Sequence, residues 1–183
     1  SEAVLMAGGI NPKTGRRYDW EAKQAEARKE DDDLKALQQQ ISLLKRQQKA
    51  VEARTKFMPF IKFTSPDPED PNDVERSKYK NAKHHDAIAR VIEEVVEGNI
   101  PFLILTMPPR HGKSEQVSRR LPAWFIGRFP HLNGVVATYN DDFAMDFGKD
   151  VRSIVKMPQF KQVFPSVSLQ RGGSASDRLQ TMQ

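Results

Sequence analysis

The sequence contains no cysteine, and this absence narrows the chemistry open to the protein. It excludes disulfide bonds, thiol catalysis and cysteine-ligated zinc, and it fits a reducing environment. Long hydrophobic runs are also missing, because the longest apolar run has the length of a strand and not of a membrane span. The N-terminus lacks the charged-then-apolar build of a secretory signal. We therefore expect no membrane partner and a cytoplasmic location.

An excess of one charge is nearly absent as well. The chain of 183 residues has 29 Lys and Arg against 24 Asp and Glu, a net charge of +5. This modest basic excess favours a polyanionic partner but is not by itself a signature of nucleic-acid binding. The length suffices for one domain with a sizeable core plus an extension.

Four segments follow from the pattern of turn formers, helix formers and apolar runs. Residues 1–18 hold several turn-forming pairs and predict a flexible leader, either a solvated end or a docking tail. Residues 19–57 predict a long helix, and residues 58–169, which contain the remaining apolar runs, predict the main domain. Residues 170–183 are rich in glycine and serine and predict a flexible tail.

Neither proline nor glycine occurs from Trp20 to Lys56, where good helix formers dominate. Apolar residues recur there at spacings of three and four, which predicts a long helix with one narrow apolar stripe: Leu34, Leu37, Ile41, Leu44 and Val51. A coiled coil and packing of the helix along the core explain the stripe equally well.

Prolines and glycines then divide the chain into further elements. Residues 64–73 contain three prolines and predict a loop, and residues 82–97 predict a helix that ends at Gly98. An apolar run at 102–106 predicts a strand.

The strand is followed by Pro108-Pro109-Arg110-His111-Gly112-Lys113-Ser114 and then by a stretch with helical character. Strand, loop and helix in this order are the layout of a phosphate-binding loop, although its usual first glycine is replaced by Met107. In such a loop Gly112 lets the backbone approach an anion, Lys113 reaches the β- and γ-phosphates of ATP, and the Ser114 hydroxyl holds Mg²⁺. Alternatively, Gly-Lys-Ser is a chance triplet on a surface loop.

The segment after this loop predicts a βαβ unit. A helix over 115–126, which Pro122 kinks or ends, leads to a second apolar run at 135–139 and a further helix over 142–156. We expect the inward face of that last helix to consist of Phe143, Phe147, Val151, Ile154 and Val155. The predicted fold class is therefore α/β. Residues 58–169 would be the N-terminal part of a P-loop ATPase domain, an incomplete P-loop NTPase with a parallel sheet flanked by helices. The long N-terminal helix precedes this domain.

The loop with its flanking residues resembles a known family. Residues 108–115, followed by Ser118-Arg119-Arg120-Leu121-Pro122-Ala123-Trp124, are similar to the ATPase core of the large terminase subunit of tailed bacteriophages. The blocks 135–142 and 146–152 are similar to the segment that follows in that family. The resemblance extends from about Phe57 to about Pro165.

This resemblance implies a set of site residues. The segment before the loop would contact adenine, in the region of Tyr79, Lys80, His84 and His85, although the two histidines could equally just open a helix. Together with the loop, the resemblance and the motif give these nucleotide-binding candidates: Tyr79, His85, Pro109, Arg110, His111, Gly112, Lys113, Ser114 and Glu115.

Arginines are candidates for catalysis beside Lys113. Arg110 could stabilise charge on the γ-phosphate, and Arg152 is a weaker candidate for acting on the nucleotide of a neighbouring subunit. Arg119 and Arg120 either face DNA or a neighbouring subunit or are solvated helix charges.

ATP hydrolysis also needs a carboxylate for Mg²⁺ and an oriented base for the attacking water. Asp141 and Asp142 are poor candidates, because the resemblance implies that the acidic strand and the nuclease domain follow beyond Gln183. We therefore expect weak or absent turnover by this chain.

The resemblance implies an ATP-driven motor that moves double-stranded DNA into a procapsid inside the infected bacterial cell. It also implies a homo-oligomeric ring and partners in the portal protein and the small terminase subunit. The alternatives are a P-loop phosphotransferase with a small substrate and a non-catalytic assembly module.

Overall fold

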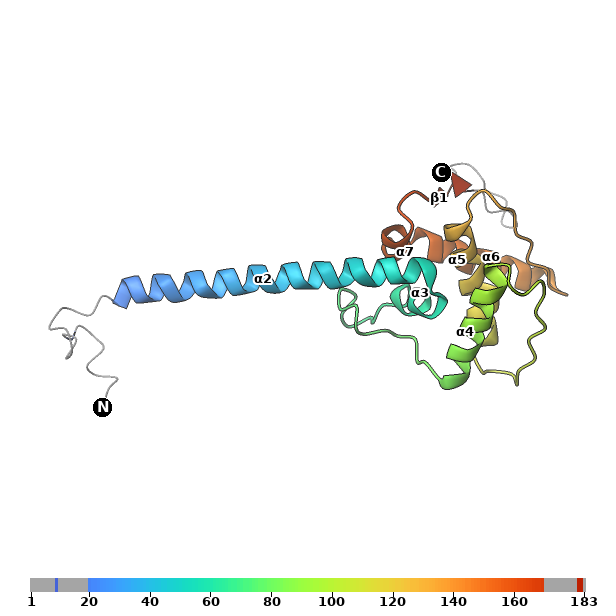
Figure 1. Ribbon diagram of the computed structural model, residues 1–183, viewed down its shortest axis with the longest axis horizontal. Helices are drawn as coiled ribbons and strands as arrows, with labels where there is room; N and C mark the ends of the chain where they lie inside the picture. The colour runs from blue at the N-terminus through green and yellow to red at the C-terminus, as the bar shows by residue number, and fades with distance from the viewer. Residues whose placement is uncertain (1–8, 10–19, 170–180, 183) are drawn as a thin grey trace. The chain divides into compact units, whose positions relative to one another are not determined.

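The computed structural model describes residues 9, 20–169 and 181–182 (Figure 1). The described residues form six α-helices and one π-helical turn: α2 (Trp20–Thr55), α3 (Phe57–Phe63), α4 (Lys83–Val96), η1 (Glu115–Arg120), α5 (Leu121–Arg128), α6 (Asp141–Lys156) and α7 (Pro158–Val163). Two short strands, β1 (Ser168–Leu169) and β2 (Thr181–Met182), pair antiparallel with Ser168 opposite Met182. Apart from residue 9 and β2, the predicted leader and tail lie outside the described residues.

The predicted α/β fold is wrong. Residues 102–106 and 135–139 form no strand, and within 20–169 and 181–182 no parallel sheet is found. Phe102, Ile104, Val135 and Tyr139 are 77, 82, 93 and 90% exposed. A strand gains its stability from paired neighbours and from burial of its faces, and these two runs have neither. A short apolar run therefore did not suffice to predict a sheet.

The helices were predicted more successfully. The structure confirms the long helix from residue 20, the helix over 82–97 as α4 and the helix over 142–156 as α6. The helix after the loop does not end at Pro122: residues 113–128 are all helical, and the turn before Pro122 takes the wider π pattern, in which the Leu121 N–H donates to the Gln116 carbonyl. The helices α3 and α7 were not predicted.

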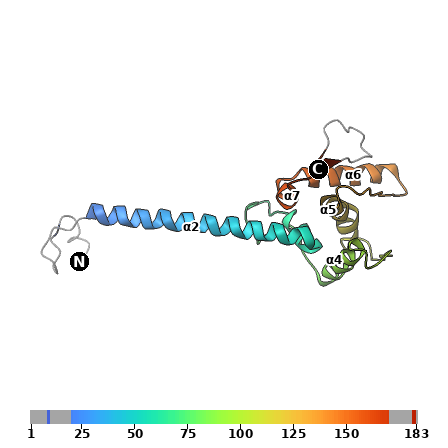
Figure 2. The ribbon, with the colours of Figure 1, turned by 45° about the horizontal axis from the view of Figure 1, so that its top comes forward.

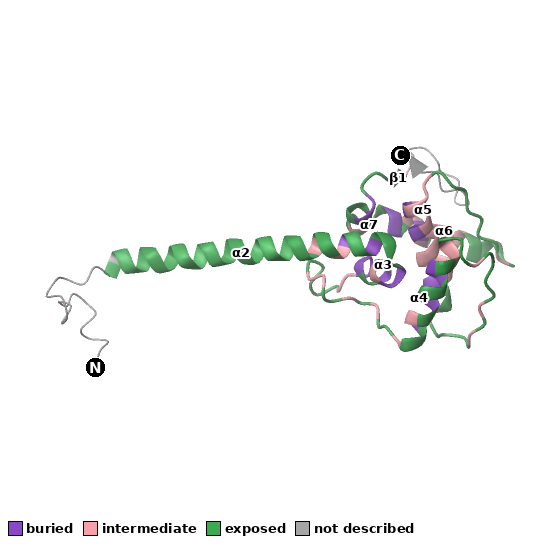
Figure 3. Cartoon of the chain, viewed as in Figure 1, coloured by how far each residue is buried: buried purple, intermediate pink, exposed green. Residues whose placement is uncertain are grey.

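The chain divides into two compact units, residues 1–44 and 45–183. In the first unit, every described side chain from residue 20 to residue 44 is exposed, as the green colour of this stretch of α2 in Figure 3 shows. Leu34, Leu37, Ile41 and Leu44 are 53, 53, 46 and 63% exposed. The predicted apolar stripe is thus present, but its leucines are not buried in a core.

The second unit has a helical core. Figure 2 shows α4, α5, α6 and α7 gathered in one cluster, with α3 packed against α4 and α5. Its largest fully buried side chains are aromatic: Phe57, Phe60, Trp124 and Phe160. The rings of Phe57 and Trp124 lie 5.1 Å apart, and the Trp124 indole donates to the Ala53 carbonyl at 3.0 Å. Burial of these rings is the main stabilising term for the unit.

Two charged side chains tie this core together. Glu93 of α4 is buried and accepts from the Phe57 N–H at 2.7 Å, so a carboxylate stabilises the N-terminus of α3. Arg120 at the end of η1 donates to the carbonyl and hydroxyl of Thr64, at 2.8 and 2.9 Å. These contacts fix α3 against α4 and against η1.

The predicted inward face of α6 is correct only in part. Val151, Ile154 and Val155 are buried, whereas Phe143 is 45% exposed and Phe147 is half-buried. Phe143 and Phe147 stack on each other with ring centroids 6.3 Å apart. The first turns of α6 therefore extend past the core, which covers only the C-terminal half of the helix.

None of the described helices is both long enough and apolar enough to cross a membrane.

Candidate functional site

The loop over 108–114 leads directly into a helix, as the sequence predicted, although no strand precedes it. Residues 113–128 are helical without a break, so Lys113 and Ser114 lie in the first turn. Arg110 and Gly112 have positive φ values of 64° and 82°. A positive φ is costly for Arg110 and easy for glycine, so the loop is a tight turn held in place by its surroundings.

His85, in the first turn of α4, holds this loop. Its Nδ1 accepts from the Ala82 N–H at 3.2 Å, which leaves the ring proton on Nε2. That Nε2 lies 3.1 Å from the His111 carbonyl oxygen and donates to it. The carbonyl and the following N–H of a trans peptide point in opposite directions. The Gly112 N–H is therefore aimed away from His85.

Gly112 lies so close to His85 that no other residue fits without a shift. A Cβ at position 112 would come within 2.7 Å of His85 Nε2. The backbone of the loop is thus in direct contact with the ring that orients it.

Next to the loop, a buried glutamine is paired with a half-buried tyrosine, a contact that the sequence did not predict. Gln116 is fully buried, and its Nε2 donates to the Tyr79 hydroxyl at 2.9 Å. The Gln116 Oε1 is also buried and accepts no hydrogen bond from the described residues. Partial burial raises the pKa of Tyr79, and the hydrogen bond from Gln116 opposes this shift. The one available signal was the placement of Gln116 one turn after Gly112, but glutamine is common on helix surfaces.

The cationic side chains at the loop are open to a ligand. Lys113 and Arg110 are exposed, as is Ser114. The adjoining Glu115 is instead occupied, since its carboxylate pairs with Arg120 at 2.8 Å and with Arg119 at 3.3 Å. The net charge of the loop that precedes it is positive.

Arg119 and Arg120, at the end of η1, are both engaged in contacts within the chain. Arg119 bridges to Asp150 on α6, and Arg120 is only 12% exposed in its bonds to Thr64. Burial lowers the pKa of Arg119, but Asp150 and Glu115 outweigh it and the net shift is upward. Both side chains have intramolecular partners, and for the mostly buried Arg120 the interpretation as a solvated helix charge is wrong.

The structure brings together most of the residues singled out in the sequence. Tyr79 and His85 lie beside the loop and the start of η1, which together hold the other candidates: Pro109, Arg110, His111, Gly112, Lys113, Ser114 and Glu115. His84 also reaches the His111 carbonyl, at 3.4 Å. Arg152 lies on α6 and not on the elements that form this cluster. The roles of these residues in binding or catalysis stay predictions.

The cluster fits a phosphate better than it fits a metal alone. Among the described residues, no group of three or more His, Asp or Glu side chains could hold a metal ion. Mg²⁺ commonly takes few protein ligands and completes its shell with water and nucleotide phosphates, which is compatible with Ser114 as the one protein ligand. Asp141 and Asp142 lie in the first turn of α6, where acids favour the helix dipole.

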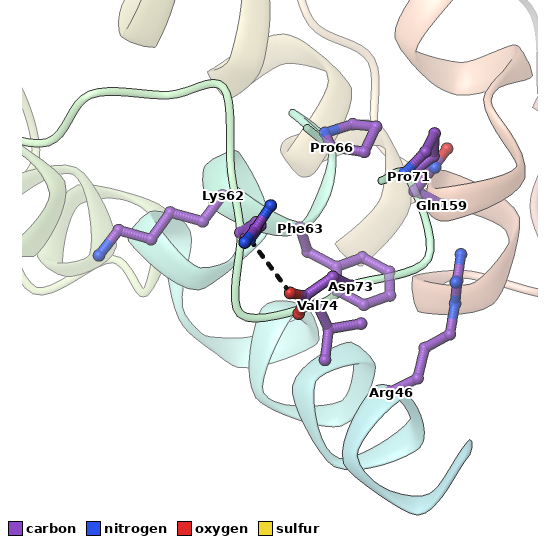
Figure 4. Close-up of a pocket in the computed structure, with 9 residues that line it drawn as sticks. Arg46, Lys62, Phe63, Pro66, Pro71, Asp73, Val74 and Gln159 are labelled. Carbon is purple, nitrogen blue, oxygen red and sulfur yellow. Dashed lines mark ion pairs between the residues drawn. The ribbon is translucent and has the colours of Figure 1, made fainter. Parts of the chain in front are cut away.

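A small pocket elsewhere in the second unit contains none of these residues (Figure 4). Its arginines already have partners: Arg46 donates to Gln162 and Asn72, and Arg76 pairs with Asp73 at 3.5 Å. The two bonds of Arg46 join α2 to α7 and to the loop over 64–73, which contains three prolines. The pocket is therefore better explained as part of the packing than as a ligand site.

Comparisons of the chain with protein-family models, with curated proteins and with solved structures find no match. The likeness to the large terminase subunit therefore rests on the quoted residues alone.

Proposed function

We propose that the protein binds ATP with Mg²⁺ at the loop over 108–114, as the ATP-binding part of a DNA-packaging motor of the terminase type. Lys113 contacts the phosphates, Ser114 holds the metal ion, and the backbone around Gly112 surrounds the anion. Arg110 adds a second positive charge beside the γ-phosphate.

The observation that carries the proposal is the hydrogen bond from His85 to the His111 carbonyl. It aims the Gly112 N–H away from α4, at the start of a helix whose first N–H groups and dipole favour an anion. Lys113 and Arg110 are exposed on the same short loop. An oriented donor, a helix N-terminus and two cations on seven residues suit a polyphosphate.

The proposal does not use a parallel sheet, because the described residues have none. ATP binding depends on the loop and its helix, which the chain supplies. The motor activity, double-stranded DNA and the portal and small-subunit partners depend on the family resemblance alone, and so does the ring. The ATP-binding part of the proposal can therefore stand when the motor part fails.

The experiment is a calorimetric titration, in which ATP is added to the chain in the presence of Mg²⁺ and the heat of binding is measured. We expect saturable binding at one site, and we expect Lys113→Ala to weaken it at least about tenfold, since a charged hydrogen bond contributes roughly 1.5–3 kcal/mol. Lys149→Ala is the matched control, because Lys149 is an exposed lysine of α6 that pairs with Asp146. Its affinity for ATP should equal that of the unmodified chain.

Two results would contradict ATP binding: no saturable binding by the unmodified chain, or an equal effect of the two lysine variants.

A measurement of ATP turnover, with and without double-stranded DNA, separates the motor from its alternatives. Stimulation of the slow expected turnover by DNA supports the motor, and stimulation by a small acceptor supports a phosphotransferase. ATP binding without any stimulation leaves the motor part unsupported.

A further inference from the structure

The apolar stripe of α2 is the largest regular set of exposed apolar side chains on one described helix. Leu34, Leu37, Ile41 and Leu44 alternate spacings of three and four and are each about half exposed, between 46 and 63%. Such residues occupy positions a and d of a heptad, the positions that face a partner helix in a coiled coil. Large apolar side chains in this pattern are costly to leave in water.

The helix uses a different face where it joins the core of the second unit. Ala50 and Ala53 are buried, while Val51, which continues the stripe, is 58% exposed. Within the second unit, the face of α2 that packs on the core is therefore not the face that continues the stripe, and this favours the coiled coil among the two explanations open from the sequence.

Charge distinguishes the possible partners. Four acidic residues, 30–33, precede the stripe, and the basic residues Lys45, Arg46 and Lys49 follow it. A second copy in parallel orientation would place Glu30 against Glu30, at a d position, and Asp31 beside Glu26 of the other helix. These like charges are destabilising.

An antiparallel second copy reverses this pattern. The layers then pair Leu34 with Leu44 of the other copy and Leu37 with its Ile41, and the next layer pairs Glu30 with Gln48. At the flanking e positions, Asp31, which also pairs with Lys35 of its own helix at 2.6 Å, faces Lys45 of the other copy. The same helix thus carries both an apolar seam and the opposite charges that a reversed copy of itself requires.

We propose that the stripe of α2 is a homodimer interface in which two copies of the chain pair their helices antiparallel around residue 39. The pairing is isologous, so each contact occurs twice about a two-fold axis. It is independent of nucleotide binding. The interface is short, and it therefore gives a reversible dimer that forms with rising protein concentration.

The first experiment measures the mass of the full 183-residue chain by sedimentation equilibrium over a wide concentration range. We expect a monomer of 20.9 kDa at low concentration and a dimer of twice that mass at high concentration. Leu37→Glu with Ile41→Glu should weaken the dimer at least about 100-fold, since each substitution removes apolar burial in both copies.

The matched control is Leu43→Glu. Leu43 is 56% exposed on the same helix but lies off the stripe, at a c position. The variant should dimerise like the unmodified chain. Circular dichroism of all variants shows whether the helix itself is kept.

Orientation is tested with cysteine, which the chain lacks. A mixture of Leu34→Cys and Leu44→Cys chains should form a disulfide between the two variants under mild oxidation. Neither variant alone should do so, because an antiparallel pair places the two copies of residue 34 about 15 Å apart along the axis. In addition, Asp31→Lys should weaken the dimer roughly threefold to tenfold, and Asp31→Lys with Lys45→Asp should restore it.

The proposal is overturned if the chain stays monomeric, if Leu43→Glu disrupts association as much as the stripe variant does, or if a larger oligomer forms instead. Cross-linking of Leu34→Cys with itself would show a parallel pair and would overturn the antiparallel arrangement.

Discussion

Residues 20–44 and residues 45–169 are both largely helical, but their helices have different causes. In the first stretch no described side chain is buried, and only the helix formers and pairs such as Asp31 with Lys35, at 2.6 Å, support the helix. In the second, the short helices α3 and α7 contain only seven and six residues and would not form alone. They exist because Phe57 of α3 packs against Trp124, and Phe60 of α3 packs against Phe160 of α7, all with buried rings.

The contrast shows that helix propensity and tertiary packing can be separated within one chain. A substitution in the first stretch should act locally, through the helix alone. The same type of substitution in the second should act on cooperative unfolding. Matched residues in the two regions allow this difference to be measured.

The two tryptophans give the largest expected difference. Trp124→Ala removes a fully buried ring that contacts Phe57, and it should lower the free energy of unfolding by about 3–5 kcal/mol. Trp20→Ala removes a ring that is 50% exposed and should change it by less than about 0.5 kcal/mol. Urea unfolding followed by circular dichroism checks both. Equal effects would mean that the first stretch shares the core.

Arginines give a difference of intermediate size. Arg120→Met removes the bonds to Thr64 and Glu115, and we expect a loss of about 1.5–3 kcal/mol. Arg28→Met, at an exposed position of α2, should have almost no effect on the same unfolding transition. The measurement compares the urea midpoints of the two variants. An unchanged midpoint for Arg120→Met would show that α3 does not depend on η1.

Alanine-to-glycine changes give the smallest difference. Ala36→Gly should destabilise the exposed helix locally by about 1 kcal/mol, seen as faster amide exchange nearby, without moving the midpoint of core unfolding. Ala53→Gly, at a fully buried position of the same helix, should move that midpoint. A shift of the midpoint by Ala36→Gly would count against the separation of the two regions.

The sequence was sufficient to predict the long helices. Local signals marked α2, α4 and α6: an interval without proline or glycine, a glycine after α4, and apolar residues at helical spacing in α6. The structure adds a cap to α6, because the Asn140 side chain accepts from the Asp142 N–H at 2.7 Å. The helix after the loop was also found, although it continues past Pro122 to Arg128. These features depend on neighbours in sequence, which a sequence shows directly.

The sheet could not be judged in the same way. The runs at 102–106 and 135–139 have strand-like composition, but a strand depends on what lies beside it. Short apolar runs are ambiguous for the same reason. The helices α3 and α7 were missed because long-range burial of phenylalanines, and not local propensity, creates them.

The candidate site was predicted as a set of residues but not as an arrangement. The loop, Tyr79 and His85 were named from the sequence, and the structure places them together. The tautomer of His85, the buried Gln116 and the occupation of Glu115 by two arginines could not be foreseen, since each depends on residues distant in sequence.

The π turn of η1 lies between the loop and α5, whose Trp124 is anchored in the core. A π turn holds one residue more than an α turn between bonded groups. If this turn lost its surplus residue, the helical residues just before it would rotate by about 100° around the helix axis relative to α5. Lys113 and Ser114 would then present themselves in a new direction, so a one-residue change of register is enough to re-aim the loop.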